Sequence, residues 1–424
     1  DPIVNKSGFD LEDKNCPICG TKMIADGQNI PFATFLGFNA EKIPDIDLNF
    51  PSDYQQKAHD STKDIFGEHN VFRAGTIGTV EEKTAFGYVK GYYEKKFHLD
   101  SKKGEDIFTR VSRNDVAYLA SKCVGVKRTT GQHAGGVMIL PKGRSIYEFT
   151  PVQYPADDKE SSWLTTHYEY RAIHDSLLKL DLLGHVDPLA LRLMSELTGI
   201  DVHDIPMNDR DVISIFTSIR ALKMKSNVLD AKTGSLAIPE FGTTTAIQTL
   251  VETQPHSFSD LVIISGLSHG TGVWAGNAEK LIVSGEKTLR EVIGCRDDIM
   301  ISLSSWGIDK SDAFKIMEFV RKGGPTKKPG EWPKWKQIMI DHNIEQWYID
   351  SCEKIEYMFP KAHAVAYVTQ AVRVAYFKVY YPLEFYSVWF SVRAKAYEIR
   401  TMLKGLEAIT NRYKELQAKS ASKK

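Results

Sequence analysis

The sequence has 424 residues, enough for two or three domains that each bury a core. With 42% hydrophobic and 25% charged residues, its composition is that of an ordinary soluble globular protein. Lys and Arg together equal Asp and Glu at 54 each, so a polyanionic partner must be bound by local basic patches and not by net charge. No apolar run approaches the roughly 20 residues of a membrane helix, and no signal peptide opens the chain. We expect a soluble protein that is not exported.

The five cysteines are an odd number scattered over a long chain, which argues against a disulfide framework and favours a reduced, cytoplasmic setting. Cys16 and Cys19 stand in CPICG, the spacing of a zinc-ribbon knuckle. Tetrahedral zinc needs four ligands, so this motif supplies half of a zinc site. A redox CxxC is the alternative, but its flanks here are polar loops. The abrupt start on Asp1 suggests a fragment.

Two carboxylates one residue apart lie in IPDIDLNFPSDY, residues 43–54. Side chains at i and i+2 of a strand point the same way, about 7 Å apart. Asp45 and Asp47 would therefore face one spot, where a cation is expected, while Ile46 and Leu48 are buried. The alternative is a turn in which the two aspartates cap backbone groups, because a Pro and an Asn stand nearby.

The pattern after this run predicts helices over residues 54–122. Within it, GTIGTVEEKT (75–84) resembles a helix start, with Thr79 as the cap and acids in the first turn. Contact with a phosphate is the alternative use of this Gly-rich stretch.

A basic, Gly-rich segment follows, VKRTTGQHAGGVMILP (126–141), which we expect to run as a loop into a strand at residues 137–140. Four Lys or Arg and no acid stand between Val124 and Tyr147. Such a window suits close approach to phosphates, although charge runs are also common on solvated faces.

A single acid, Asp181, interrupts the apolar strand predicted in LLKLDLLGHVDP (177–188). A charge there costs several kcal/mol unless it is paired or bound to a metal. An ion pair with Lys179 is the alternative, which we set aside because that lysine can also reach solvent. Asp181 is thus a candidate third metal ligand, and Asp187-Pro188 predicts the start of a helix.

From about residue 201 the pattern predicts successive helices with short links. Their expected ranges are 209–217, 239–253, 258–265, 296–305, 310–322, 345–357, 361–378 and 383–413. Two stretches are strongly basic, 315–336 and the tail from Arg393, and residues 323–336 have the composition of a loop.

Three carboxylates on strands, followed by a basic helical domain, fit two-metal phosphoryl transfer, in which oxygen ligands bridge two Mg²⁺ ions about 4 Å apart. The residues by themselves thus indicate a metal-dependent phosphotransferase.

Many ordered blocks across residues 8–395 resemble the PolC-type alpha subunit of bacterial DNA polymerase III, a C-family polymerase. They are PDIDLNF, AGTIGTVEEKTAFGYVKGY, GVKRTTGQHAGG, LLKLDLLGH, ISGLSHGTGVWAGNA, VIGCRDDIM, KIMEFVRKG, WYIDSCEKIEYMFPKAHAVAYV and AVRVAYFKVYYPLEFY. An origin in the related DnaE type is disfavoured by the CPICG knuckle and the GTIGT block.

The resemblance implies an α+β fold: a polymerase-beta-like nucleotidyltransferase palm with a mixed sheet, an inserted helical thumb and a large all-helical fingers domain. The expected boundaries are a partial zinc knuckle at 1–30, palm at 31–53 and 124–188, thumb at 54–123, fingers at 189–395, and a C-terminal helix and tail at 396–424.

The resemblance also implies site residues. Asp45, Asp47 and Asp181 would be the catalytic ligands of two magnesium ions. The residues expected to bind the incoming nucleotide are Arg296, Arg321, Lys322, Lys361 and His363, with Tyr357 packing on its sugar and base; burial of Tyr357 in the core is the alternative. Those expected to contact DNA are Lys127, Arg128 and His133. Zinc is expected only if an upstream CxxC completes the site.

The implied function is template-directed DNA synthesis in bacterial chromosome replication. The implied partners are primer-template DNA, deoxynucleoside triphosphates and, for the full-length protein, replisome proteins such as the sliding clamp. The isolated chain is expected to be inactive, and the alternative is a DNA- or nucleotide-binding module without turnover.

The sequence also departs from the family pattern. It has HAGG (133–136) for HPGG, HVDP (185–188) for HDDP, and Gly272 where the family has Asp. The family's upstream CxxC and Gly-Ser motif are absent from this sequence.

Overall fold

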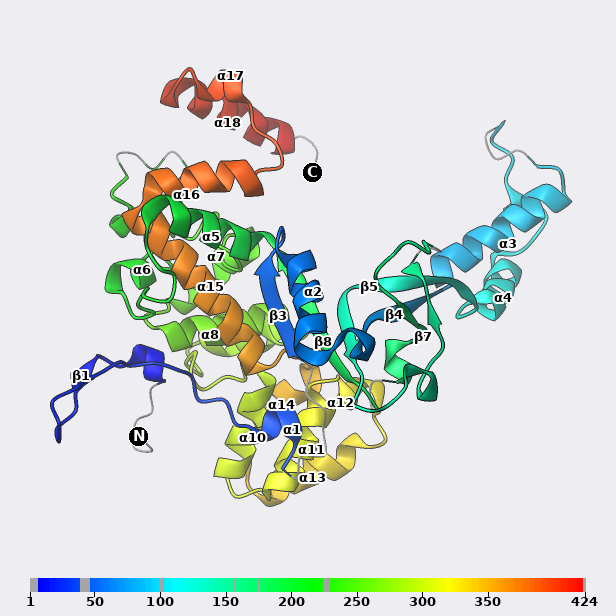
Figure 1. Cartoon of the computed structure of the whole chain (residues 1–424), viewed down its shortest axis with the longest axis horizontal. Coiled ribbons are helices and arrows are strands. Elements are labelled where there is room, and N and C mark those ends of the chain that lie inside the picture. The colour runs from blue at the N-terminus through cyan, green and yellow to red at the C-terminus, as the bar shows by residue number, and fades with distance from the viewer. Residues whose placement is uncertain are drawn as a thin grey trace. The chain divides into compact units, whose positions relative to one another are not determined.

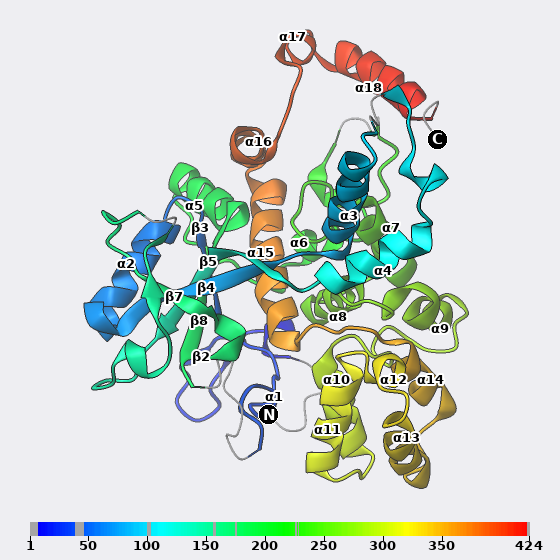
Figure 2. The same ribbon diagram turned by 90° about the vertical axis from the view of Figure 1, so that its right-hand side faces the viewer.

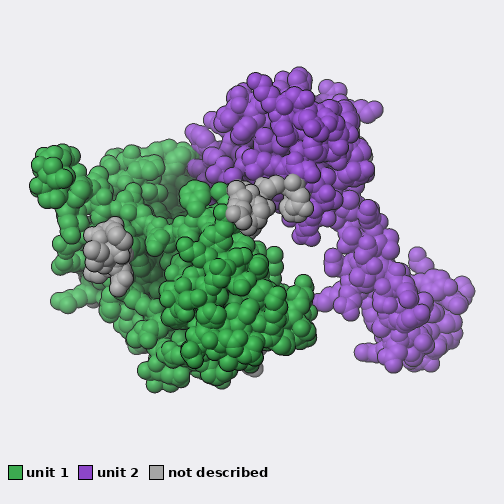
Figure 3. Space-filling model, turned by 90° about the horizontal axis from the view of Figure 1, so that it is seen from below, with its two compact units in different colours: residues 1–42, 186–424 green, residues 43–185 purple. Residues whose placement is uncertain are grey.

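The structure is a computed structural model that describes residues 7–38, 46–99, 103–155, 158–173, 176–224, 227 and 229–421. It divides into two compact units (Figures 1 and 3). Unit 1 comprises Asp1–Lys42 and Val186–Lys424, and unit 2 comprises Ile43–His185. Unit 2 is built on a mixed sheet and unit 1 is predominantly helical, so the predicted α+β class is confirmed. No helix in the described part of the chain is both long and apolar enough to cross a membrane.

Unit 2 contains a six-stranded sheet. In spatial order its strands are β3 (Ile46–Pro51), β8 (Leu178–His185), β5 (Lys127–Ile139), β4 (Val71–Thr79), β7 (Thr165–Glu169) and β6 (Val152–Gln153). β3 and β8 run parallel, and β5 runs antiparallel to both of its neighbours. The two strands that carry the predicted acids are therefore adjacent, although 126 residues lie between them in sequence.

Alternating side chains give this sheet an apolar cluster on each face. Phe72 and Met138 belong to one cluster, and Val71 and Val137 to the other. Burying each such side chain contributes roughly 1.5–3 kcal/mol. Helix α2 (Gln55–Phe66) adds Ala58 to the second cluster, so that face is covered by a helix.

The prediction of helices over 54–122 is wrong at residues 71–79, which form β4. Its first five residues are buried, as in a central strand, and Val, Phe, Thr and Ile favour a pleated surface. Thr79 ends that strand and caps no helix, since the next helix begins after Glu81. Residues 127–136 were expected to be a loop but belong to β5, in which 127–132 pair with β4 and Gly136 pairs with β8. Close packing favours glycine here: a Cβ on Gly75 would lie 2.0 Å from the Thr166 carbonyl oxygen.

The helical part of the predicted thumb is a hairpin of α3 (Glu82–Lys96) and α4 (Arg113–Cys123), visible in Figure 2. It has its own apolar cluster, which includes Val89, Ile107 and Val116. Hydrogen bonds from Val80 N to Val126 O and from Gly125 N to Val80 O close the hairpin at its base. The hairpin is thus an insertion between β4 and β5.

Most helices of unit 1 pack around one large apolar core, to which α12, α17 and α18 contribute no described residue. Helix α15 runs through it beside α8 (Figure 1). The α-helices of unit 1 are α1 (Ala33–Leu36), α5 (Val186–Thr198), α6 (Arg210–Ser214), α7 (Thr244–Thr253), α8 (Phe258–His269), α9 (Glu279–Val283), α10 (Arg296–Ser305), α11 (Lys310–Val320), α12 (Gly324–Lys327), α13 (Trp332–Asp341), α14 (Gln346–Lys354), α15 (Lys361–Tyr380), α16 (Pro382–Val388), α17 (Ile399–Met402) and α18 (Leu406–Ala421).

Two predictions in this unit need correction. The expected loop at 323–336 contains α12 and the start of α13, because Pro325 and Pro333 occupy first-turn positions where proline is favourable. The single helix expected at 383–413 is three helices, and Gly405, with φ +86°, separates the last two. The expected range 296–305 coincides with α10.

The N-terminal segment belongs to unit 1. The rings of Phe9 and Phe258 lie 4.8 Å apart, and Asn208 Nδ2 donates to Leu11 O at 2.8 Å. The short strands β1 (Lys14–Asn15) and β2 (Lys22–Met23) form an antiparallel hairpin around the CPICG motif.

Candidate functional site

Asp47 and Asp181 are register partners on the parallel strands β3 and β8. Partner residues on adjacent strands, about 4.8 Å apart, present their side chains to the same face of the sheet. The structure therefore brings together two of the three predicted acids across 133 intervening residues. Asp45, the third, lies outside the described residues.

Lys179 forms an ion pair with Asp181, with Nζ 2.7 Å from Oδ2. The expectation from the sequence that Asp181 is not paired with Lys179 was therefore wrong. Residues two apart share a face of β8, and the ammonium lies 4.0 Å from the centre of the Tyr170 ring, which holds it near the sheet. The other oxygen of the carboxylate, Oδ1, is buried and has no hydrogen-bond partner among the described residues.

His133 lies beside this oxygen, with Nδ1 3.5 Å from Asp181 Oδ1. Nδ1 accepts a hydrogen bond from the Gly136 backbone N–H at 2.7 Å, so it carries no proton and the neutral ring is protonated at Nε2. Burial, followed by the charge of Lys179, lowers the pKa of His133. His133 is thus a neutral imidazole next to the acids.

Arg73 anchors the backbone around His133. Its Nη2 donates to the carbonyl oxygens of His133 and Ala134 at 2.9 and 3.0 Å, and its Nη1 lies 2.7 Å from Nδ1 of His59. The guanidinium is buried. Burial of His59, followed by the charge of Arg73, lowers the pKa of His59. Sequence reasoning missed Arg73, although a charge inside the apolar run VFRAG is the same signal that identified Asp181.

The three residues predicted to contact DNA all lie on β5 but do not lie together. Lys127 and Arg128 are exposed at its first residues, where Arg128 lies 5.8 Å from the Tyr88 ring of α3. His133 is five residues further along, roughly 17 Å at strand rise, and adjoins Asp181.

The CPICG motif forms a tight knuckle. Cys16 N donates to Thr21 O at 2.8 Å, Gly20 N donates to Cys16 O at 2.9 Å, and Gly20 has a φ of +74°. Hydrogen bonds with Thr21 and then with Cys16 lower the pKa of the exposed Cys19 thiol to about 7. Within the described ranges, no three His, Cys, Asp or Glu side chains are close enough together to hold a metal ion.

Several of the predicted nucleotide-binding residues lie on or next to a connecting segment, residues 355–360, between α14 and α15. Backbone hydrogen bonds join it to three other places. Thr271 N donates to Tyr357 O at 2.9 Å, Met358 N to Arg321 O at 3.0 Å, and Arg296 N to Phe359 O at 3.2 Å. Residues from separate helices are thereby fixed around one extended strand of backbone.

Three of the predicted cations meet at one carboxylate, Glu318 on α11. Arg321 Nε and Nη2 donate to its two oxygens at 2.7 and 2.8 Å, and Lys322 Nζ lies 3.3 Å away. Nη1 of Arg296 approaches at 3.9 Å. Sequence reasoning missed Glu318, although it precedes Arg321 by three residues and Lys322 by four, the spacing at which helical side chains meet.

Arg296 is only 8% exposed, so its side chain is buried inside unit 1. Its Nη2 donates to Thr34 O at 3.3 Å, and Nε lies 3.9 Å from Asp297 Oδ2. Burial, followed by the charge of Arg321, lowers its pKa.

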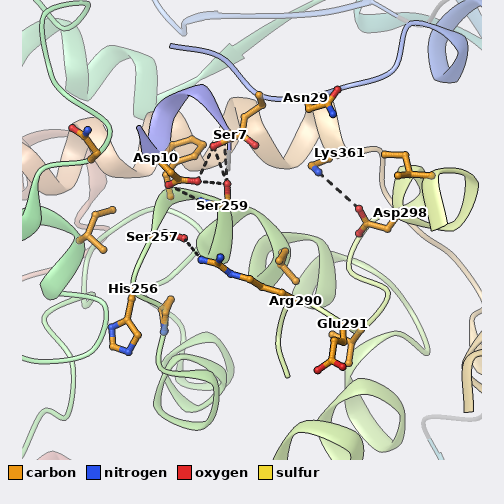
Figure 4. Close-up of a pocket in the computed structure, with 18 of the residues that line it drawn as sticks. Ser7, Asp10, Asn29, His256, Ser257, Ser259, Arg290, Glu291, Asp298 and Lys361 are labelled. Atoms are coloured by element: carbon orange, nitrogen blue, oxygen red, sulfur yellow. Dashed lines mark hydrogen bonds and ion pairs between the residues drawn. The ribbon is translucent and has the colours of Figure 1, made fainter. Parts of the chain in front are cut away.

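Lys361 points elsewhere, into a cavity of about 960 Å³ shown in Figure 4. There its Nζ lies 3.9 Å from Asp298 Oδ1, while its backbone N–H donates to Asp297 at 2.7 Å. Ser257, Ser259 and Arg290 line the same cavity. Lys361 therefore does not join the Glu318 cluster.

His363 packs between Phe359 and Tyr367, with ring centroids 4.9 and 4.4 Å away, and adjoins His269. His269 Nε2 pairs with Glu240 at 2.6 Å, and this contact raises the pKa of His269. Burial and the charge of His269 lower the pKa of His363. Of these two histidines, His269 is therefore the one whose charged form is favoured, and sequence reasoning missed it.

Tyr357 is 42% exposed, so its burial in the core is ruled out, and its ring lies 5.2 Å from that of Phe359. Gly272, a departure from the family pattern, has a φ of +71° beside this segment. A Cβ there would lie 2.1 Å from the Lys354 carbonyl oxygen, so this backbone has room only for glycine.

Comparisons with known proteins agree with this architecture. Residues 16–184 match the family "Bacterial DNA polymerase III alpha NTPase domain", and residues 187–343 match the "Bacterial DNA polymerase III alpha subunit finger domain". The boundary between the two matches coincides with the boundary of the two units at residues 185 and 186.

Proteins named "DNA polymerase III PolC-type" are similar along 97% of this chain. Identity is 52% over 413 residues to that of Oceanobacillus iheyensis, and 53% to those of Bacillus subtilis, over 414 residues, and Listeria monocytogenes, over 413. The chain spans 28% of the length of each relative. It therefore belongs to the family of the bacterial DNA polymerase III alpha subunit, and its similarity is to the PolC-type members.

Proposed function

We propose that this chain carries the nucleotidyl-transfer centre of a template-directed DNA polymerase. The observation that carries the proposal is that Asp47 and Asp181 are register partners on parallel strands, and that Oδ1 of Asp181 is buried without a hydrogen-bond partner among the described residues. A hard cation satisfies such an oxygen well, so the donor set fits magnesium. The names of the relatives support the same function.

Asp45, Asp47 and Asp181 would hold two magnesium ions. Such ions activate the primer 3′-hydroxyl and stabilise charge at the alpha-phosphate. Lys179, which packs on the Tyr170 ring, pairs with Oδ2 of Asp181. Oδ1 receives no hydrogen bond from the described residues. His133, protonated at Nε2, is a hydrogen-bond donor beside the acids.

The sheet of unit 2 would be the palm, the α3–α4 hairpin the thumb, and the helices of residues 189–395 the fingers. Arg321 and Lys322 would bind the triphosphate, and Tyr357 would pack on the sugar and base. Lys127 and Arg128 would contact the DNA backbone. In the complete natural polypeptide the partners would include primer-template DNA, deoxynucleoside triphosphates and replisome proteins such as the sliding clamp.

Replacing Arg321 tests the nucleotide-binding part of this proposal. A charge-assisted bond to phosphate contributes about 1.5–3 kcal/mol, so Arg321→Ala in the complete polypeptide is expected to raise the KM for the nucleotide about tenfold or more. Primer-template affinity should stay nearly unchanged. Steady-state primer extension and equilibrium DNA binding measure the two quantities.

Lys328→Ala is the matched control, because Lys328 is an exposed cation of the same basic stretch and pairs with Glu331 at 3.2 Å. Its KM should equal that of the wild type. If Arg321→Ala instead weakens DNA binding with a shallower salt dependence and leaves the KM alone, Arg321 belongs to the DNA-binding surface.

A second candidate function is nucleotide or DNA binding without turnover by the 424-residue chain. β3, which carries Asp47, is an edge strand of the described sheet and so has one ladder of backbone groups not covered by another strand. Primer extension by the chain alone separates the two functions, since a binding module retains DNA and nucleotide without product.

A further inference from the structure

Glu318 grips Arg321 with both of its oxygens. The two hydrogen bonds run from Nε and Nη2 at 2.7 and 2.8 Å, so carboxylate and guanidinium lie as a bidentate pair. Both side chains are mostly shielded from water, at 15% exposure for Arg321 and 19% for Glu318. Surface ion pairs contribute little because water competes with them, but a shielded bidentate pair fixes the guanidinium plane.

The backbone that carries Arg321 is fixed independently of this pair. Arg321 O accepts from Met358 N at 3.0 Å, which joins the end of α11 to the connecting segment. Gly323 has a φ of +73°, and a Cβ there would lie 2.5 Å from Glu356 O. The main chain is thus held in place, and the freedom left to Arg321 is that of its side-chain rotamers.

Glu318 also balances the charge of its neighbours. Arg296 and Lys322 approach the same carboxylate, so three cations share one anion, and Asp297 lies 3.9 Å from Arg296. The guanidiniums of Arg296 and Arg321 carry like charges and repel each other, and this repulsion contributes to the lowered pKa of Arg296. Without Glu318 the mobile Arg321 side chain would move away from its neighbours.

We propose that Glu318 is a positioning residue for nucleotide binding, which holds Arg321 ready for the triphosphate by occupying the Nε and Nη2 edge of its guanidinium. The Nη1 edge is then the one that meets a phosphate. The proposal rests on the nucleotide-binding function proposed above for Arg321. The side-chain ordering that binding otherwise requires is done beforehand by Glu318, so its contribution appears in the KM.

Two variants of Glu318 in the complete polypeptide test this inference. Glu318→Ala is expected to raise the KM for deoxynucleoside triphosphate about five- to tenfold, with kcat and primer-template affinity within about twofold of the wild type. Glu318→Gln is expected to give an intermediate KM, because the amide has one acceptor oxygen for Arg321 and no charge. It keeps the side-chain volume, so it reports on position even if the alanine variant folds poorly.

Asp312→Ala is the matched control. Asp312 pairs with Lys315 at the same i,i+3 spacing on the same helix, at 3.2 Å, but that pair is exposed. Its KM should equal that of the wild type. An unchanged KM in both Glu318 variants overturns the inference, and so does a lowered KM, which would mean that the carboxylate competes with the nucleotide.

The double variant separates this inference from the proposed function. If Glu318 acts through Arg321, Glu318→Ala adds nothing to the KM of Arg321→Ala. If Arg321→Ala leaves the KM unchanged, both the nucleotide-binding role of Arg321 and the positioning role of Glu318 are wrong. If Arg321→Ala raises the KM and Glu318→Ala does not, only the inference about Glu318 fails.

Discussion

The acids of unit 2 and the cations of unit 1 are placed by different kinds of backbone. Asp47 and Asp181 sit at fixed register positions of two hydrogen-bonded strands, so their spacing follows from the sheet itself. Arg296 is the first residue of α10, and Arg321 follows the last residue of α11. Hydrogen bonds to residues 355–360 fix the backbone at both places, and Glu318 fixes the side chain of Arg321. Strand register therefore sets the metal-binding candidates, whereas side-chain contacts set the anion-binding ones.

Both places share one electrostatic feature. Asp181 already has a cation, Lys179, and Arg321 already has an anion, Glu318. A ligand at either place therefore approaches the atom that the counter-ion leaves open: a cation would meet Oδ1 of Asp181, and a phosphate would meet Nη1 of Arg321. The counter-ion stays in place and orients the group, which reduces the side-chain ordering that binding requires.

The largest effect is expected at the sheet. Asp181→Ala in the complete polypeptide should lower kcat about a thousandfold or more, because a metal ligand contributes several kcal/mol and each 1.36 kcal/mol is tenfold in rate. DNA should still bind, as primer-template titration would measure. Asp64→Ala, which removes an exposed acid on α2, is the control. If Asp181→Ala changed the KM and left kcat unchanged, its effect would be of the kind expected for Arg321→Ala, and the kinetic difference between the two places would be lost.

The connecting segment of unit 1 should be sensitive to added volume. Gly272→Ala is expected to lower the free energy of unfolding by about 3 kcal/mol or more, since the Cβ meets Lys354 O and φ is +71°. Gly276→Ala has nearly the same φ, +69°, but open space around the Cβ, so it should cost about 1 kcal/mol. Urea unfolding of the two variants isolates the overlap, and equal losses would show that the segment yields.

A pH-dependent contribution is expected from His269 and Glu240. The ion pair raises the pKa of His269, so its stabilisation is complete below the ordinary histidine pKa and is lost as pH rises through the raised value. Burial raises the pKa of Glu240, but the hydrogen bond and charge of His269, together with the charges of His363 and Arg393, outweigh burial and lower the pKa, so the pair persists down to mildly acidic pH. His269→Gln should therefore cost about 1–2 kcal/mol at pH 6 and less at pH 9.

The control for that measurement is His203→Gln, which removes an exposed pair with Asp201 at 2.8 Å. Water screens exposed pairs, so its loss should be small at both pH values. A cost of His269→Gln that grows with pH would contradict the assignment of His269 as the cation.

The smallest effect concerns reactivity without loss of stability. Cys19 should be alkylated by iodoacetamide in the native chain, at a rate that rises as pH passes through about 7. Cys295 and Cys352 are buried, which raises the pKa of both thiols, so they should react only after unfolding. Peptide mass spectrometry gives the order of labelling. Equal labelling of Cys19 and Cys352 would show that unit 1 opens readily.

Features that depend on local pattern were predictable from the sequence. The apolar strand around Asp181 and the capped helix at 296–305 are examples, because period and caps define them. β4 was missed because its glycines and threonines read as a helix entry, and its pairing with β5 is a long-range property. The meeting of Arg321 and Lys322 at Glu318 was accessible from the sequence by helical spacing, although Glu318 was missed. The turn of Lys361 toward Asp298 instead depends on tertiary packing.

The contact of Arg73 with two carbonyl oxygens has an evolutionary consequence. Every residue type has a carbonyl oxygen, so the anchor at position 134 survives any change of side chain. Gly135 and Gly136 have no such latitude, because a Cβ would lie 2.7 Å from Leu182 O at the first and 2.8 Å from His133 Nδ1 at the second. Among variants of this part of β5, substitutions should therefore accumulate at residue 134, whereas both glycines should stay unchanged.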